Sequence, residues 1–121
     1  MAEIFTLFYD YQIRLNLYHF QTNSYAGHKA SDAHLAKFKI HFDRFLEVWQ
    51  GVFGKIVFKK SETIKLSNVK STDDIIEATL TINKYLNELA RQYEEDHQYL
   101  VNLIDEILSD NNQFLYLLTF E

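Results

Sequence analysis

The sequence predicts an all-α protein, a bundle of four helices with one long connection between the second and third helices. Three observations support this fold class. Four stretches repeat apolar residues at steps of three and four, the period of a buried helix face. The 121 residues include three Gly and no Pro, so little interrupts long helices. The stretch after the second helix lacks this period. At this length we expect a single domain, 1–121.

The first two helices are expected at about 3–21 and 29–51. The apolar stripe of the first consists of Ile4, Phe8, Tyr11, Leu15 and Tyr18, and that of the second of Leu35, Phe38, Phe42, Phe45 and Trp49. The polar loop QTNSYAG separates them, and Gly51 and Gly54 are expected to end the second helix. Because the loop is short, the two helices should be antiparallel neighbours.

The third and fourth helices are expected at about 72–94 and 97–119. Ser71 and Asp74 match the start of a capping box, which predicts that the third helix begins there. The segment EEDHQ predicts a short turn before the last helix. These two helices should therefore also be antiparallel neighbours.

Residues 52–71 form the long connection. Its residues VFGKIVFKKSETIKLSNVK are β-branched and basic, which predicts an extended crossing with a short hairpin around Ser61–Thr63. A connection of this length can run along the whole bundle, which gives the ferritin-like topology. An up-down-up-down bundle is the alternative.

Composition excludes several classes of function. The absence of Cys excludes a disulfide framework, an iron–sulfur cluster and a thiolate zinc site. The formal net charge of −5 argues against general binding of nucleic-acid backbones. No apolar run approaches the ~20 residues of a membrane span, and the start MAEIFTLFYDYQ lacks the basic region of a signal peptide. We therefore expect an intracellular protein that is neither secreted nor bound in a membrane.

Four side chains of the second helix form one stripe of metal-ligand types. They are His28, Asp32, Asp43 and Glu47. On a helical wheel this stripe is centred roughly 110° from the apolar stripe. Asp32 and Asp43 are roughly 16 Å apart along the axis, whereas ligand atoms must lie ~2.0–2.2 Å from a first-row metal. One helix therefore cannot bring both pairs to one ion.

Two antiparallel copies of this helix would bring the pairs together. With a two-fold axis near residue 37 or 38, His28 and Asp32 of one chain meet Asp43 and Glu47 of the other, twice per dimer. His19, at the end of the first helix, adds an imidazole to the first pair. Two imidazoles and three carboxylates suit Fe(II), Zn(II) or Mn(II). A solvated helix face is the alternative, because charges four residues apart are common on helices.

The sequence resembles the Dps-type mini-ferritins (DNA-binding proteins from starved cells). LYHFQT supplies the His near the end of the first helix, HKASD the His-x3-Asp pair and DRFLE the Asp-x3-Glu pair, at the family's 4–11–4 spacing. The C-terminal LVNLIDEILSDNNQFLYLLTF also resembles the family's last helix. The sequence is still more similar to a group of small proteins of large DNA viruses that share H[FW]QT-x-SYA-x-HKA.

The mini-ferritin resemblance implies a ferroxidase that oxidises Fe(II) with peroxide or oxygen, for iron storage and detoxification inside a dodecamer. It implies iron, as one ion or as a di-iron pair, between two-fold related subunits, with zinc or manganese as substitutes. His19, His28 and Asp32 would come from one subunit, and Asp43 and Glu47 from its neighbour. The compartment would be the cytoplasm, including that of a host cell, or a virion.

Several residues depart from the family pattern. The link from His19 to His28 is shorter than in the family, and Lys37 stands where the family often has Trp. Lys39 lies within the proposed contact between two copies of the second helix, where an unpaired ammonium would repel Fe(II). The basic N-terminal tail that members use for DNA is missing, so tail-mediated DNA binding is not expected. The short link, Lys39 and a crossing of extended residues in place of the family's helical insert favour the alternative function. That alternative is a ferritin-like scaffold or virion-associated interaction protein without ferroxidase activity.

Three other histidines are candidate ligands. Glu94 and His97 form one Glu-x-x-His motif, whereas bundle-type di-iron proteins need two. His34 and His41 fall outside the stripe, and we expect both at the surface.

Overall fold

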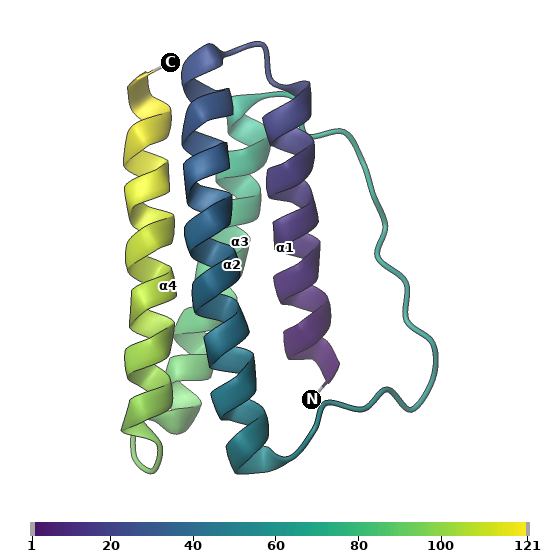
Figure 1. The fold of residues 1–121 in the computed structure, drawn as a ribbon, viewed down its shortest axis with the longest axis vertical. Coiled ribbons are helices and arrows are strands. Elements are labelled where there is room, and N and C mark those ends of the chain that lie inside the picture. The colour runs from purple at the N-terminus through teal and green to yellow at the C-terminus, as the bar shows by residue number, and fades with distance from the viewer. Residues whose placement is uncertain (1, 121) are drawn as a thin grey trace.

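The structure, a computed structural model that describes residues 2–120, contains four long helices and a final 3-10 turn (Figure 1). The elements are α1 (Ala2–Gln21), α2 (Tyr25–Phe53), α3 (Thr72–Tyr93), α4 (Gln98–Leu117) and η1 (Leu118–Phe120). The predicted all-α bundle of four helices is confirmed. The hairpin expected around Ser61–Thr63 is wrong, because residues 54–71 contain no strand and follow an irregular path.

The connection from α2 to α3 runs along α1. Near the start of α1, the Phe58 and Phe5 rings meet edge to face at 5.8 Å. At its end, the Gln21 side-chain oxygen accepts a hydrogen bond from the Val69 backbone N–H at 2.7 Å. The connection therefore returns the chain to the end of the bundle where α2 began, and α2 and α3 point the same way (Figure 1).

A side-chain cap sets the start of α2. The Ser24 hydroxyl accepts a hydrogen bond from the Gly27 backbone N–H at 3.0 Å, so the helix begins at Tyr25, ahead of the expected residue 29. Only residues 22–24 separate α1 from α2. The earlier start places His28 inside the helix and next to the end of α1.

Two further signals set the end of α2 and the start of α3. Gly54 adopts φ 97°, which favours glycine, and its N–H bonds the Gln50 carbonyl at 2.8 Å. Gly51, which we also expected at the helix end, lies within α2. Ser71 and Asp74 form the predicted capping box, with both reciprocal hydrogen bonds present.

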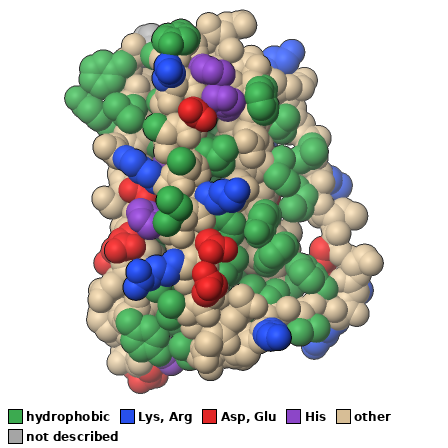
Figure 2. All heavy atoms as spheres, viewed as in Figure 1, with side chains coloured by type: hydrophobic (Ala, Val, Ile, Leu, Met, Phe, Trp, Pro, Cys, Tyr) green, Lys and Arg blue, Asp and Glu red, His purple; other side chains and the backbone are tan. Residues whose placement is uncertain are grey.

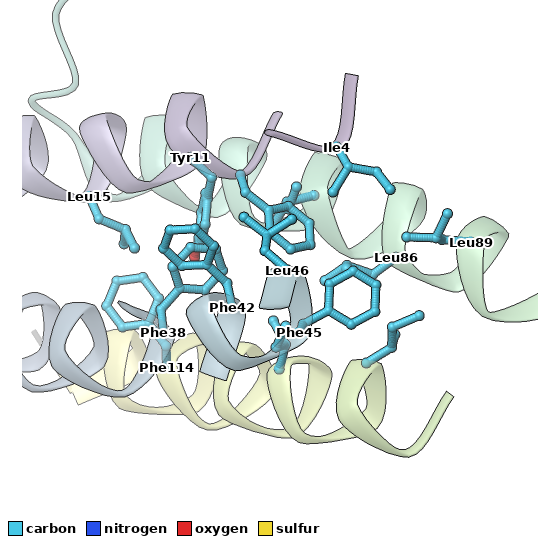
Figure 3. Close-up of a cluster of buried hydrophobic side chains, with 14 of the residues drawn as sticks. Ile4, Tyr11, Leu15, Phe38, Phe42, Phe45, Leu46, Leu86, Leu89 and Phe114 are labelled. Carbon is cyan, nitrogen blue, oxygen red and sulfur yellow. The ribbon is translucent and has the colours of Figure 1, made fainter. Parts of the chain in front are cut away.

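Aromatic and aliphatic side chains pack together in the core (Figure 3). Phe8 of α1 meets Phe42 of α2 edge to face at 5.6 Å, and Tyr11 meets Phe38 at 5.0 Å. The Trp49 indole N–H donates to the Tyr93 hydroxyl at 2.8 Å, which ties α2 to α3. The α1 and α2 rings in these contacts all lie on the predicted apolar stripes.

One polar cluster interrupts this core. His34, which we expected at the surface, is only 4% exposed because α4 packs over that side of α2 and Phe114 stacks on the imidazole at 4.5 Å. Its Nε2 lies 3.2 Å from the Tyr11 hydroxyl, which lies 2.8 Å from the Thr79 hydroxyl. Thr79 donates to the Ile75 carbonyl. Tyr11 must therefore donate to Thr79, and neutral His34 carries its proton on Nε2.

Gly27→Ala should destabilise the bundle. A Cβ at this position would lie 2.2 Å from the hydroxyl oxygen of Tyr18, a fully buried ring of α1. The ring or the helices must move, so we expect the free energy of unfolding to fall by about 1–3 kcal/mol, the usual cost of overpacking. Urea unfolding followed by circular dichroism measures this change.

Gly51→Ala is the matched control for this prediction. The substitution is the same and lies in the same helix, but no atom is within 4 Å of the added Cβ. Alanine should raise the free energy of unfolding there by about 0.5–1 kcal/mol. An equal effect of the two variants would show that the close approach at Gly27 does not constrain the fold.

The stability of the fold should fall at mildly acidic pH. Burial lowers the pKa of His34 to about 4, although the Asp110 carboxylate acts in the opposite direction. Between this value and the ordinary 6.5, the His34 imidazole is protonated in the unfolded chain and neutral in the folded one. The contribution of His34 to the free energy of unfolding is therefore complete above ~6.5 and is lost as pH falls toward ~4. We expect a loss of about 2 kcal/mol between pH 7 and pH 5 from this residue.

His34→Gln should remove this contribution, and urea midpoints at the two pH values measure it. His97→Gln is the control, because His97 lies in the turn before α4, outside the buried cluster. The account of His34 is wrong if His34→Gln and the wild type lose the same stability on acidification.

Candidate metal-binding site

Two histidines stack where α1 ends and α2 begins. The rings of His19 and His28 have centroids 3.9 Å apart and are inclined by 18°. Each Nδ1 lies beside the backbone carbonyl of the other residue, His19 Nδ1 at 3.0 Å from the His28 oxygen and His28 Nδ1 at 2.8 Å from the His19 oxygen. A carbonyl only accepts, so each Nδ1 carries a proton. Each neutral ring therefore keeps a lone pair on Nε2, the tautomer that a metal ligand needs.

Ser31 supports this pair from the interior. The residue is fully buried, and its hydroxyl donates to the His28 carbonyl at 3.1 Å and lies 3.4 Å from His19 Nδ1. Ser31 was missed by sequence reasoning, although its position three residues after His28 places it within one helical turn. On the solvent side, exposed Phe20 and Tyr25 flank the two imidazoles.

The three carboxylates lie on the exposed surface of α2. Asp32 follows His28 by one turn, whereas Asp43 and Glu47 lie farther along. Figure 2 shows histidine and acidic side chains together near the upper end of this face, with more acidic side chains below them and a basic one between. Because α2 is one unbroken helix, the axial separation of roughly 16 Å between Asp32 and Asp43 holds.

The five predicted ligands do not form a complete site in one chain. The structure brings His19 and His28 together, but across residues 2–120 no three His, Asp or Glu side chains gather closely enough to hold an ion. Imidazole nitrogens and carboxylate oxygens are nevertheless the donor types that first-row divalent metals accept. The chain therefore presents two partial sets of metal ligands, which we call donor sets. One consists of His19, His28 and Asp32, and the other of Asp43 and Glu47 farther along α2.

Nearby charged residues take other partners or none. The Lys37 ammonium donates to the Gln113 side chain at 2.7 Å, away from the stripe. His41, expected at the surface, is partly buried and pairs with Asp110 of α4. Lys39 is exposed, and in the described part of the chain it has no ion-pair partner. Its ammonium lies within the stripe and opposes cation binding.

The Glu-x-x-His motif plays no part in this face. Glu94 is exposed just after α3, and His97 precedes α4, where its ring contacts Phe53 at 5.2 Å. Both residues thus lie at the opposite end of α2 from the histidine pair.

Comparison with known proteins assigns a family. Residues 19–118 match a family described as "Family of unknown function (DUF5856)", so the match covers both histidines and all three carboxylates. No curated protein and no solved structure matches the chain. No helix within residues 2–120 is long and apolar enough to span a membrane. Because the match extends over most of its length, the chain belongs to the DUF5856 family.

Proposed function

We propose that this chain is a ferritin-like protein of the Dps mini-ferritin type, which binds Fe(II) between two copies of α2 and oxidises it for storage or detoxification. The observation that carries the proposal is the stacked pair of His19 and His28. Their Nδ1 atoms are held by carbonyls and their Nε2 lone pairs are available, one helical turn from the Asp32 carboxylate.

The residues on the exposed face of α2 are suited to contact with a second copy of the chain related by a two-fold axis. Between the two donor sets lie Ala33 and Ala36, both exposed and small enough for close helix approach, and Ile40, which is 67% exposed. Two antiparallel copies of this face would place Ala36 and Ile40, together with Lys39, near the centre. One donor set of each chain would then lie beside the other set of its partner. The long connection and the parallel directions of α2 and α3 support the ferritin-like topology.

Iron is the substrate of the proposed reaction. Asp32 of one chain, with Asp43 and Glu47 of the other, would hold the cation by charge, while the imidazoles of His19 and His28 would set its position. With peroxide as oxidant, two Fe(II) ions each lose one electron, and the peroxide takes up two electrons and two protons to form two waters. Zinc or manganese would compete for the same donors. For the size of the assembly, the mini-ferritin resemblance predicts a dodecamer.

A scaffold or virion-associated interaction protein without ferroxidase activity is the second candidate. The unpaired Lys39 ammonium between the donor sets favours it, because a positive charge there opposes Fe(II). In that case the same α2 face would mediate assembly alone.

Iron oxidation distinguishes the two functions. Metal-free protein mixed with Fe(II) and peroxide should generate ferric absorbance faster than a protein-free mixture. His28→Ala and Glu47→Ala should each reduce this rate to near background, because each removes a ligand from both sites of a dimer.

Glu88→Ala is the control, since it removes an exposed carboxylate from α3, outside the stripe. Wild-type protein that oxidises no faster than background would favour the scaffold. If the wild type is faster than background but His28→Ala, Glu47→Ala and Glu88→Ala all match its rate, iron is oxidised away from the proposed site and the proposal is wrong.

A further inference from the structure

The two donor sets stand at mirrored positions along α2. His28 and Glu47 lie equally far from a point between residues 37 and 38, and so do Asp32 and Asp43. Two antiparallel copies of α2 that cross at this point therefore bring each donor set beside the complementary set of the partner, at two sites at once. What holds such a pair of chains together follows from the charges on this face, and the inference rests on the proposed metal site.

The face that would form this contact has little apolar surface. Between the two donor sets its exposed apolar side chains are Ala33, Ala36 and Ile40, and Ile40 is the one large residue among them. Stable protein–protein interfaces usually bury ~1,200–2,000 Å² around a core that is depleted of charged residues. Apolar contact along this face therefore contributes little to holding two copies together.

Negative charge on the same face opposes the contact. In a separate chain Asp32 lies roughly 16 Å along the helix axis from Asp43, and the carboxylates of Asp32, Asp43 and Glu47 are all exposed to water. None of the three has an ion-pair partner within residues 2–120. In the dimer, Asp32 of one chain would lie beside Asp43 and Glu47 of the other. Three like charges would then meet at each site, and their repulsion disfavours pairing.

Lys39 supplies only part of the positive charge that such a site needs. It lies one helical turn before Asp43 and close to the proposed two-fold axis, and it has no ion-pair partner in the described chain. The Lys29 ammonium lies over the Tyr25 ring, 5.8 Å from its centroid, toward the start of α2. Three carboxylates and the Lys39 ammonium leave two negative charges at each site. One divalent cation per site would neutralise them.

The histidine pair determines which divalent cation suits this position. The Nδ1 atoms of His19 and His28 are held by backbone carbonyls of the same chain, so this half of the site is already formed before a partner arrives. Imidazole nitrogen together with carboxylate oxygen suits first-row ions such as Zn(II) and Fe(II). Mg(II) prefers oxygen ligands and retains several waters. Charge alone is therefore not sufficient for an ion to join the two donor sets.

We propose that a first-row divalent cation controls the pairing of two chains. Without the cation, the exposed carboxylates keep the α2 faces apart and the protein is monomeric. With it, one ion at each of two sites joins the His28 end of one α2 to the Glu47 end of the other. Because neither donor set is complete within residues 2–120 of one chain, metal binding and pairing are thermodynamically linked. Assembly would thus respond to the concentration of the metal.

Sedimentation velocity of metal-free protein, first in EDTA and then with Zn(II), tests this link without any iron oxidation. Zn(II) suits the same ligands and does not change its oxidation state. Each of the two sites should multiply the dimerisation constant by one plus the ratio of free Zn(II) to its Kd. About a tenfold excess over the Kd should therefore raise that constant about 100-fold. Calorimetry should give one Zn(II) per chain at saturation, and Mg(II) should leave the chain monomeric.

Neutral replacements of the carboxylates distinguish this link from an ordinary contact surface. The double variant Asp43→Asn/Glu47→Gln removes metal ligands and repulsion together. Zn(II) should therefore no longer promote dimerisation, while pairing in EDTA should be no weaker than that of the wild type. His28→Ala should also lose the response to Zn(II). Glu88→Gln removes an exposed carboxylate from α3, outside the stripe, and should keep the full response. Circular dichroism verifies that each variant folds.

Equal dimerisation of the wild type in EDTA and in Zn(II) overturns this inference, and so does a wild type that stays monomeric in both. A Zn(II) response that His28→Ala retains also overturns it, because the cation would then act elsewhere on the chain. Iron oxidation separates this result from the proposed function. A permanently dimeric protein that oxidises iron keeps the function without the link, whereas a Zn(II)-dependent dimer that oxidises no iron keeps the link without the function.

Discussion

The close approach of α1 and α2 at Gly27 is the contact on which the candidate site depends. The buried Tyr18 ring occupies the space that any larger side chain at position 27 would need. The residues that follow this contact in each helix are His19 and His28, and only this spacing lets their rings stack and exchange hydrogen bonds with each other's backbone. A packing constraint in the interior thus sets the tautomer of two imidazoles at the surface.

The length of α2 imposes the second constraint. A helix of 29 residues without a break keeps its side chains at fixed heights, so Asp43 and Glu47 cannot reach the histidine pair of their own chain. If all five donors serve one ion, the missing donors must come from another copy. The exposed Ala36 and Ile40 between the donor sets are consistent with such a copy. The positive charge of Lys39 in the same region instead opposes the binding of a cation.

Sequence periodicity predicts the four helices well, because each bundle helix buries one stripe and the stripes run at helical steps. The residues that set helix boundaries, such as the capping box of Ser71 and Asp74, act locally and can also be predicted from the sequence. The burial of His34 cannot be predicted in this way, because it depends on which side of α2 faces α4. A groove of about 450 Å³ between α1 and α3, lined also by residues 67–69 of the connection, likewise depends on how distant segments pack, which no local pattern encodes.

The central claim is that each iron site is shared between two chains, and mixed dimers test it directly. His28→Ala and Glu47→Ala, each inactive alone, are unfolded together and refolded as a mixture, and iron oxidation is followed by ferric absorbance. A mixed two-fold dimer regains one intact site of its two, and random pairing makes half of all dimers mixed. The account predicts recovery of about a quarter of the wild-type rate. No recovery, from variants that fold and pair normally, would contradict it.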